Sequence, residues 1–305
     1  MTRTIELPKK LLLAVDSQGM CEHALHACLW LARVLPAEVE CLHAFPPRPI
    51  LWGKSSQAAE WEAGTDVTRR GLARMLQDFV RRAPVELRPL AALDPDRLAV
   101  HSGHSASLVV ERARSGAADL VLLGPHRTRR GMDFGNTARG VLAKAHCPVW
   151  LQPAPARPIQ RILVPTDLSP HADHALAYAR RLAQRLDARV TVLHVFEPPV
   201  LGAAETLVPG PTYAVEDLKR EAVRSFEEHV QRLELDSSGV VREFLIGNTV
   251  DTILGLQARH DLVVMGTHGH TGFAAALLGS VTYSVARSIR TALLAVPHPG
   301  REFLQ

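Results

Sequence analysis

Short apolar runs alternate with longer stretches of helical periodicity along this chain. In the second half, the apolar run Ile162–Thr166 precedes a stretch from Ala172 to Leu186 whose apolar positions recur at the spacing of one helix face. The same alternation predicts strands over 190–196, 240–246, 262–265 and 293–296, with helices over 215–233, 250–258 and 280–289. Near-continuous apolar strands alternating with helices are typical of parallel sheets covered on both faces, so we predict a doubly wound α/β fold.

The chain also repeats itself. Residues 11–45 align with residues 162–196 without a gap, and DLVLLGPH at 119–126 matches DLVVMGTH at 261–268. The identical pairs include Asp16/Asp167, His23/His174, Leu42/Leu193 and His43/His194. We therefore predict two tandem copies of one domain: residues 1–152, a short Pro-rich linker over 153–160, and residues 161–305.

Composition agrees with two folded domains and narrows the choice of partners. Of the 305 residues, 47% are hydrophobic and 22% charged, which is typical of a globular protein. The net charge is only +4, so nothing in the composition demands a nucleic acid partner. The apolar run Leu11–Val15 is too short for a signal peptide, and no run approaches a membrane span. We expect a cytoplasmic protein with no membrane partner.

The four cysteines do not indicate a disulfide framework or a zinc site. They contain no CxxC pair, and Cys21 and Cys28 stand where the second copy has Ala172 and Ala179. We expect these small apolar residues in the core.

A glycine-rich segment after Met265 is the strongest functional signal. It reads GTHGHTGFAAALLGSVT, with Gly266, Gly269 and Gly279 followed directly by Ser280 at the start of a predicted helix. Glycines let backbone approach an anion, and a helix N-terminus offers unpaired N–H groups. Ser280 is expected to cap the helix and to donate its hydroxyl to a phosphate. A loop with an ordinary N-cap is the alternative. The Lys of a P-loop and the spacing GxGxxG are both absent.

The pattern G-x2-G-x9-G-S after a DLVVMG strand, with PTD at 165–167 and LHV at 193–195, resembles the universal stress protein family. Two copies in one chain are similar to its tandem members. The resemblance implies a five-stranded parallel sheet flanked by helices in each domain, and ATP binding where the motif is complete. It also implies that the copies meet through their last strands, around 149–151 and 293–296.

The resemblance implies a nucleotide site in the second copy. Asp167 would contact the ribose, with Pro165 and Thr166 beside it, and Val195 would offer its backbone to the adenine. A further set would line the ribose and take the phosphates: Met265, Gly266, His268, Gly269, Gly279, Ser280, Val281 and Thr282. A Mg²⁺ or Mn²⁺ ion is expected only through the phosphates.

The first copy departs from this pattern. Its loop has Arg127 at the second glycine position and Asn136 in place of the serine, and Ala14 and Ala44 stand where the second copy has Pro165 and Val195. Asp16 is kept. A side chain at position 127 would crowd the approach of backbone to phosphate, so we predict one ATP per chain, in the second copy.

Several residues allow a structural interpretation beside a functional one. Asp167 could simply cap the helix that follows it, because Asp16 persists in the degenerate copy. His268 and His270 suit acid/base or metal chemistry, although a solvent-facing position is the more common case. His43 and His194 repeat on a strand, which favours a role in the fold.

The first copy contains two further groups without an assigned role. Arg127, Arg129 and Arg130 form a basic tip, for which solvation is the simpler interpretation and anion binding the alternative. Trp52 and Trp61 either pack or line an apolar pocket.

The preferred functional hypothesis is a nucleotide-dependent sensor or adaptor in the stress response, not a dedicated catalyst, because the implied site has no lysine for phosphoryl transfer. A slow ATPase or nucleotidyl transferase, with His268 or His270 assisting, is one alternative. A lipid- or protein-binding module without nucleotide is the other. Both a homodimer and a pseudo-dimer within one chain agree with the repeat.

Overall fold

The computed structural model describes residues 5–15, 22–45, 57–82, 98–124, 126–128, 131–133, 135–199, 211–235, 239–269 and 278–298. The first half contains β1 (Lys10–Val15), α1 (Glu22–Val34), β2 (Glu38–Phe45), α2 (Gln57–Arg82), β3 (Leu98–Ser102), α3 (Ser105–Ser115), β4 (Leu120–Leu123), β5 (His126–Thr128), β6 (Gly131–Asp133), α4 (Asn136–Lys144) and β7 (Val149–Leu151). The second half contains β8 (Arg161–Pro165), α5 (Pro170–Leu186), β9 (Arg189–Phe196), α6 (Pro211–Arg232), β10 (Val241–Ile246), α7 (Thr249–Leu256), the 3-10 helix η5 (Gln257–Arg259), β11 (Leu262–Gly266), α8 (Ser280–Ser288) and β12 (Ala292–Val296).

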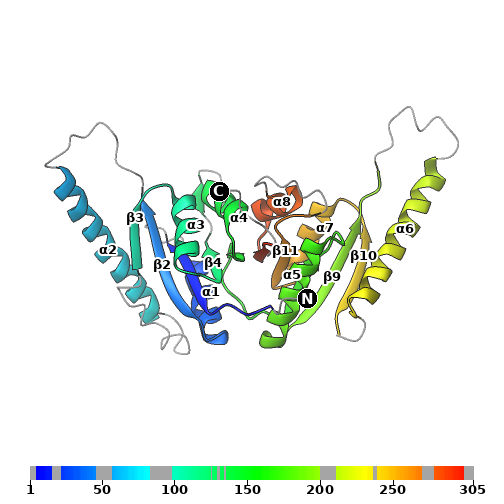
Figure 1. The fold of residues 1–305 in the computed structure, drawn as a ribbon, viewed down its shortest axis with the longest axis horizontal. Helices are drawn as coiled ribbons and strands as arrows, with labels where there is room; N and C mark the ends of the chain where they lie inside the picture. Colours follow the sequence, from blue (N-terminus) through cyan, green and yellow to red (C-terminus); the bar gives the residue numbers. More distant parts are fainter. Residues whose placement is uncertain are drawn as a thin grey trace.

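Ten strands form one continuous sheet in the order β10-β9-β8-β11-β12-β7-β4-β1-β2-β3. Within each half the five strands are parallel, and the two halves meet where β12 and β7 pair antiparallel, with Leu294 opposite Trp150. Figure 1 shows the halves side by side, with α2 and α6 at opposite outer ends. The doubly wound α/β fold and the pairing of the last strands are thus confirmed, whereas the boundaries at 152 and 161 stay a prediction.

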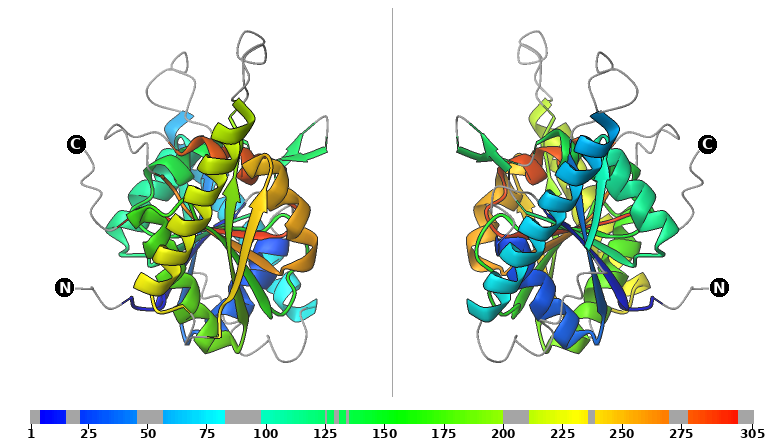
Figure 2. Two further views of the ribbon diagram at one scale, coloured as in Figure 1. Left: turned by 90° about the vertical axis from the view of Figure 1, so that its right-hand side faces the viewer. Right: turned by 90° about the vertical axis from the view of Figure 1, so that its left-hand side faces the viewer.

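Helices cover both faces of the sheet, and each face has its own core. Alternate residues of a strand point to opposite faces. Leu11 and Leu13 therefore belong to the core that includes residues of α1, α2, α5 and α6, and Leu12 belongs to the core that includes residues of α3, α4, α7 and α8. Both cores extend across the two halves. The views of Figure 2, along the sheet from either end, place α6 or α2 in front.

The second half of the repeat owes its geometry to local signals that the sequence carries. Ser169 accepts a hydrogen bond from the backbone N–H of Ala172 (3.2 Å) and caps α5, and Pro170 occupies the first turn, where its missing N–H costs nothing. The helix ends at Asp187 in the left-handed conformation. The resulting helix buries its apolar face against β8, β9 and β11.

His43 and His194 have the role in the fold that their repetition indicates. The Nδ1 atom of His43 lies 2.8 Å from the carbonyl oxygen of Val15, and that of His194 lies 2.9 Å from the carbonyl oxygen of Thr166. A carbonyl can only accept, so each Nδ1–H donates. Both bonds tie the end of the second strand to the end of the first.

The cysteines of the described residues are buried thiols: Cys28, Cys41 and Cys147. Burial raises the pKa of Cys147 to about 12 and that of Cys28 well above its usual range. The predicted place of Cys28 in the core is confirmed, while Cys21 lies outside the described residues. None of the helices in the described part of the chain combines the length and the apolar character needed to cross a bilayer.

Candidate functional site

Two motifs of the second copy meet at one edge of the sheet. Asp167 follows β8, and the glycine loop follows β11, which is the neighbour of β8 in the sheet. From β8 the chain winds outward through β9 and β10, then returns to β11 and β12 on the other side. The carboxyl ends of β8 and β11 are therefore the point at which the winding reverses, where ligands of this architecture bind.

The turn after β8 presents the Asp167 side chain to solvent. Thr166 is only 6% exposed, and its hydroxyl accepts a hydrogen bond from the N–H of Leu168 at 3.0 Å. Oδ1 of Asp167 accepts a hydrogen bond from the N–H of Ser169 at 3.1 Å. Leu168 itself adopts a positive φ of 65°. Since Ser169 caps α5, the interpretation of Asp167 as the cap is wrong.

The Asp167 carboxylate lies against the backbone of Gly269. A Cβ at position 269 would lie 2.1 Å from Oδ2, so no residue with a side chain fits beside this carboxylate in its present position. This contact brings the PTD motif and the glycine loop into one site.

Gly266 and Gly279 close the loop tightly. A Cβ on Gly266 would lie 3.2 Å from the carbonyl oxygen of His171 in α5. The N–H of Gly279 donates to the carbonyl oxygen of Thr267 at 2.9 Å, and a Cβ on Gly279 would lie 3.2 Å from that oxygen. The segment after β11 thus returns to the point at which it left the sheet, and α8 begins there.

The first turn of α8 presents backbone N–H groups. Its N-cap is Gly279, without a side-chain cap, so the expectation that Ser280 caps the helix is wrong by one residue. The first intrahelical bond runs from the N–H of Tyr283 to the carbonyl of Gly279, so the N–H groups of Ser280, Val281 and Thr282 have no partner within the helix. The exposed Ser280 carries its hydroxyl beside these N–H groups.

The side chain of Thr282 binds the start of the glycine loop. Its hydroxyl donates to the carbonyl oxygen of Gly266 at 2.8 Å, and the residue is only 4% exposed. An anion could therefore reach Thr282 only through its backbone N–H.

Three further residues of the expected nucleotide site differ from one another in how exposed they are. Pro165 ends β8 and is half-buried, and Val195 lies on β9 two residues beyond Leu193, the residue that pairs with Pro165. Met265 is 5% exposed and belongs to the core on the α8 face of the sheet, so only its main chain can contribute to a site.

A group of histidines beside the loop was missed by sequence reasoning. The ring of His171 lies 6.0 Å from that of His268 and 4.7 Å from that of His298, and His174 lies 5.7 Å from His298. The spacing of His171 and His174 on one helix face was the available signal. Burial lowers the pKa of His174, and the neighbouring His298 and His171 lower it further.

His268 is half-buried instead of solvent-facing, and its Nδ1 atom lies 2.9 Å from the hydroxyl of Thr267. Within the described residues, no three His, Cys, Asp or Glu side chains are arranged to hold a metal ion. His270 lies outside the described residues.

The first copy has a different backbone after its fourth strand. The segments β5 and β6 pair antiparallel where a plain loop was expected, and Figure 2 shows this hairpin projecting from the sheet. Helix α4 begins at Asn136 with Gly135 as its N-cap. Asp16, Arg129, Arg130 and Trp52 lie outside the described residues, as do the side chains of Arg127 and Trp61.

Comparisons with known proteins agree with this fold and repeat. A universal stress protein of Mycobacterium tuberculosis is 31% identical over 155 residues, which cover 46% of this chain and 49% of that protein, so the chain spans about half the length of this relative. A universal stress protein of Thermus aquaticus is 34% identical over 132 residues, 41% of this chain and 88% of that protein. The crystal structure of a universal stress protein from Archaeoglobus fulgidus covers 96% of this chain and 99% of its own, with a TM-score of 0.64 at 17% identity, which shows a shared fold.

The sequence profile of the universal stress protein family matches twice, over residues 8–153 and 158–297. These two matches cover both halves of the ten-stranded sheet and nearly the whole chain. The chain belongs to the universal stress protein family and carries two tandem domains of it.

Proposed function

We propose that this chain is a nucleotide-dependent sensor or adaptor of the stress response that binds one ATP in its second domain. The observation that carries the proposal is the contact of the Asp167 carboxylate with the backbone of Gly269, next to a helix whose first N–H groups have no partner within the helix. An acceptor for a diol and a donor array for phosphate thus adjoin at one edge of the sheet.

Each part of the site suits one part of ATP. A carboxylate accepts hydrogen bonds from both ribose hydroxyls, which fits exposed Asp167. The N–H groups of Ser280, Val281 and Thr282 and the positive end of the α8 dipole favour the phosphates. Pro165 and Val195 offer half-buried apolar contacts for the base. A Mg²⁺ or Mn²⁺ ion would reach the site through the phosphates.

Equilibrium binding of ATP to the purified chain tests the proposal. Gly279→Glu places a carboxylate before the α8 N-terminus and a side chain against Thr267, so ATP affinity should fall by roughly a hundredfold or more. Asp167→Ala, at an exposed position, should weaken binding by about tenfold without loss of the fold.

The matched control is Gly255→Glu, which adds the same side chain to an open position on α7 and should leave the affinity unchanged. No saturable binding of ATP to the wild type, or equal affinity in wild type and both site variants, would refute the proposal.

A slow ATPase is the second candidate, and the half-buried His268 beside the glycine loop is the observation that favours it. Hydrolysis over many turnovers that His268→Ala abolishes, with ATP affinity kept, would establish a catalyst. If the wild type hydrolyses ATP no faster than the Gly279→Glu variant, the second candidate is refuted and the sensor or adaptor function is retained.

A further inference from the structure

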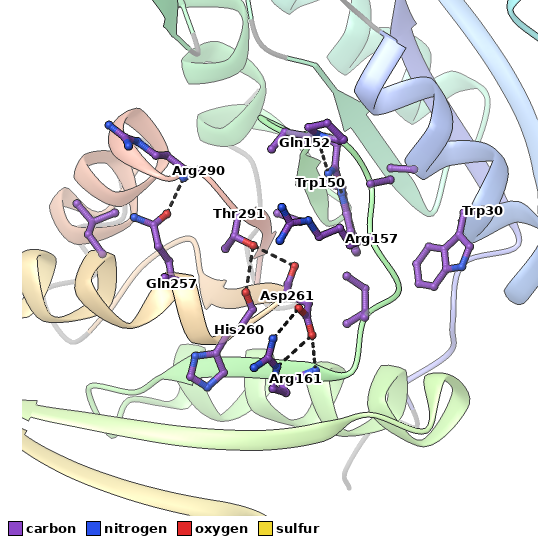
Figure 3. Close-up of a pocket in the computed structure, with 18 residues that line it drawn as sticks. Trp30, Trp150, Gln152, Arg157, Arg161, Gln257, His260, Asp261, Arg290 and Thr291 are labelled. Atoms are coloured by element: carbon purple, nitrogen blue, oxygen red, sulfur yellow. Dashed lines mark hydrogen bonds and ion pairs between the residues drawn. The ribbon is translucent and has the colours of Figure 1, made fainter. Parts of the chain in front are cut away.

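A second pocket opens where the two halves of the chain meet. Its volume is about 300 Å³, and its walls come from α1, the residues that join β7 to β8, and the segments leading into β11 and β12 (Figure 3). Arg161 begins β8, and Asp261 and Thr291 directly precede β11 and β12. The pocket therefore lies at the amino ends of these strands, at the edge opposite the proposed nucleotide site.

The lining of this junction pocket is positively charged. It contains three arginines, Arg157, Arg161 and Arg290, and a single acidic residue, Asp261. The acid is already engaged, because Oδ1 lies 3.2 Å from the Arg161 guanidinium and Oδ2 accepts from the N–H groups of Gln160 and Arg161 at 3.1 and 3.0 Å. Burial alone would raise the pKa of Asp261, but these donors hold it below its usual value.

Arg157 is the cation available to a ligand, because Arg161 is paired with Asp261 and the Arg290 side chain points away from the pocket (Figure 3). No hydrogen bond or ion pair to another described residue involves its side chain. Figure 3 shows it extending from the linking segment into the pocket, between Trp150 and Thr291. A guanidinium whose donors have no partner among the described residues, next to a carboxylate that is already neutralised, favours an anion.

Three other polar groups of the lining have partners within the protein. The indole N–H of Trp150 donates to Oε1 of Gln152 at 2.8 Å, and the amide of Gln152 donates to the carbonyl of Ala154 at 2.7 Å. The hydroxyl of Thr291 donates to the carbonyl oxygen of Asp261 at 3.2 Å. The pocket also offers apolar surface to a ligand. This surface includes the half-buried indole of Trp30 (Figure 3).

We propose that the junction pocket binds a small anionic molecule with a flat apolar body, the anionic head on Arg157 and the body against Trp30 and the neighbouring apolar lining. The residues that join β7 to β8, Arg157 among them, form one wall of this pocket. The site is a product of the tandem arrangement and is independent of the nucleotide site.

Titration with 8-anilinonaphthalene-1-sulfonate, a fluorescent sulfonate with a flat aromatic body, tests the proposal. We expect one saturable site per chain and an affinity that Arg157→Glu lowers by about tenfold or more. Arg259→Glu is the matched control, because Arg259 is exposed on η5 beside the pocket without lining it, and should change the affinity less than about twofold. Trp30→Ala should also weaken binding.

Competition identifies the head group and separates the two sites. Displacement of the dye by 1-naphthyl phosphate but not by 2-naphthoate indicates a phosphate ligand, and the reverse indicates a carboxylate. Gly279→Glu should leave dye binding intact. Binding that Gly279→Glu abolishes, binding indifferent to Arg157→Glu, or displacement by neither competitor would overturn the proposal. Thermal unfolding of each variant shows that the fold is kept.

Discussion

Gly269 illustrates how a single residue decides whether the candidate site can exist. A methyl group there would collide with Oδ2 of Asp167 and push the carboxylate aside. We predict that Gly269→Ala weakens ATP binding by about tenfold while the melting temperature changes little, because the displaced carboxylate is exposed.

The control for this variant is Gly255→Ala on α7, where a Cβ meets open space. It should stabilise the protein by up to about 1 kcal/mol through helix propensity and leave ATP affinity unchanged. Isothermal titration and urea unfolding measure both quantities. Full ATP affinity in Gly269→Ala would mean that Asp167 does not contact the nucleotide.

Four partly buried histidines predict that the protein loses stability in mild acid. Burial is the main cause that lowers the pKa of His26, His146, His174 and His194. Because the unfolded chain then binds more protons, their contribution to stability is complete above the unfolded pKa of about 6.5 and is lost as pH falls through the lowered folded values.

We therefore expect a smaller free energy of unfolding at pH 5.5 than at pH 7.5 in urea titrations. Hydrogen bonds and ion pairs outweigh burial and lower the pKa values of Asp173 and Asp261. The stability that these two carboxylates contribute is therefore present throughout this range and is lost only at more acid pH. His174→Gln should reduce the dependence on pH in this range. A free energy that is constant from pH 7.5 to 5.5 would contradict the prediction.

Individual residues were predictable where their chemistry is local. The PTD and glycine motifs pointed to Asp167 and Gly269 because each motif occupies a few consecutive positions. The histidine group was not predictable, since His171, His268 and His298 come from three segments that meet only when β11 and β12 lie beside α5.

At the scale of elements, the N-cap of α5 leads to a prediction about the free energy of unfolding. Ser169 is completely buried, and its hydroxyl satisfies the N–H of Ala172 at the start of α5. Ser169→Ala should lower the free energy of unfolding by about 1 to 2 kcal/mol. The control, Ser288→Ala at the exposed end of α8, should stay within about 0.5 kcal/mol. An equal loss in the two variants would argue against the cap.

Elements were predicted well where apolar periodicity marks them. The strands and helices of the second half lie within a few residues of their expected positions, because each must bury one face or stripe. The β5–β6 hairpin was missed, as its Arg-rich segment has no alternation of apolar residues. The cap of α8 was misplaced by one residue because Gly and Ser are both common there.

The number of ATP molecules bound per chain is a property of the whole molecule. The two domains have one fold, but the first has Arg127 where the second has Gly269, and its segment after β4 forms the β5–β6 hairpin. We predict one ATP per chain, and Gly135→Glu, at the α4 position that corresponds to Gly279, should leave that number and the affinity unchanged. Two equivalent sites per chain in the titration, or loss of binding in Gly135→Glu, would show that the first domain also binds.

The sequence by itself determined the class of fold, the duplication and the motifs of the second copy, since periodicity, repeats and local spacing are all properties of neighbouring positions. Only the tertiary structure decided which distant groups share a site. Pairing of β12 with β7 joined the two sheets, the winding of β8 and β11 placed Asp167 on Gly269, and packing of the two halves assembled the junction pocket around Arg157. Such contacts depend on how strands order themselves in the sheet to bury both faces, and no local pattern encodes that order.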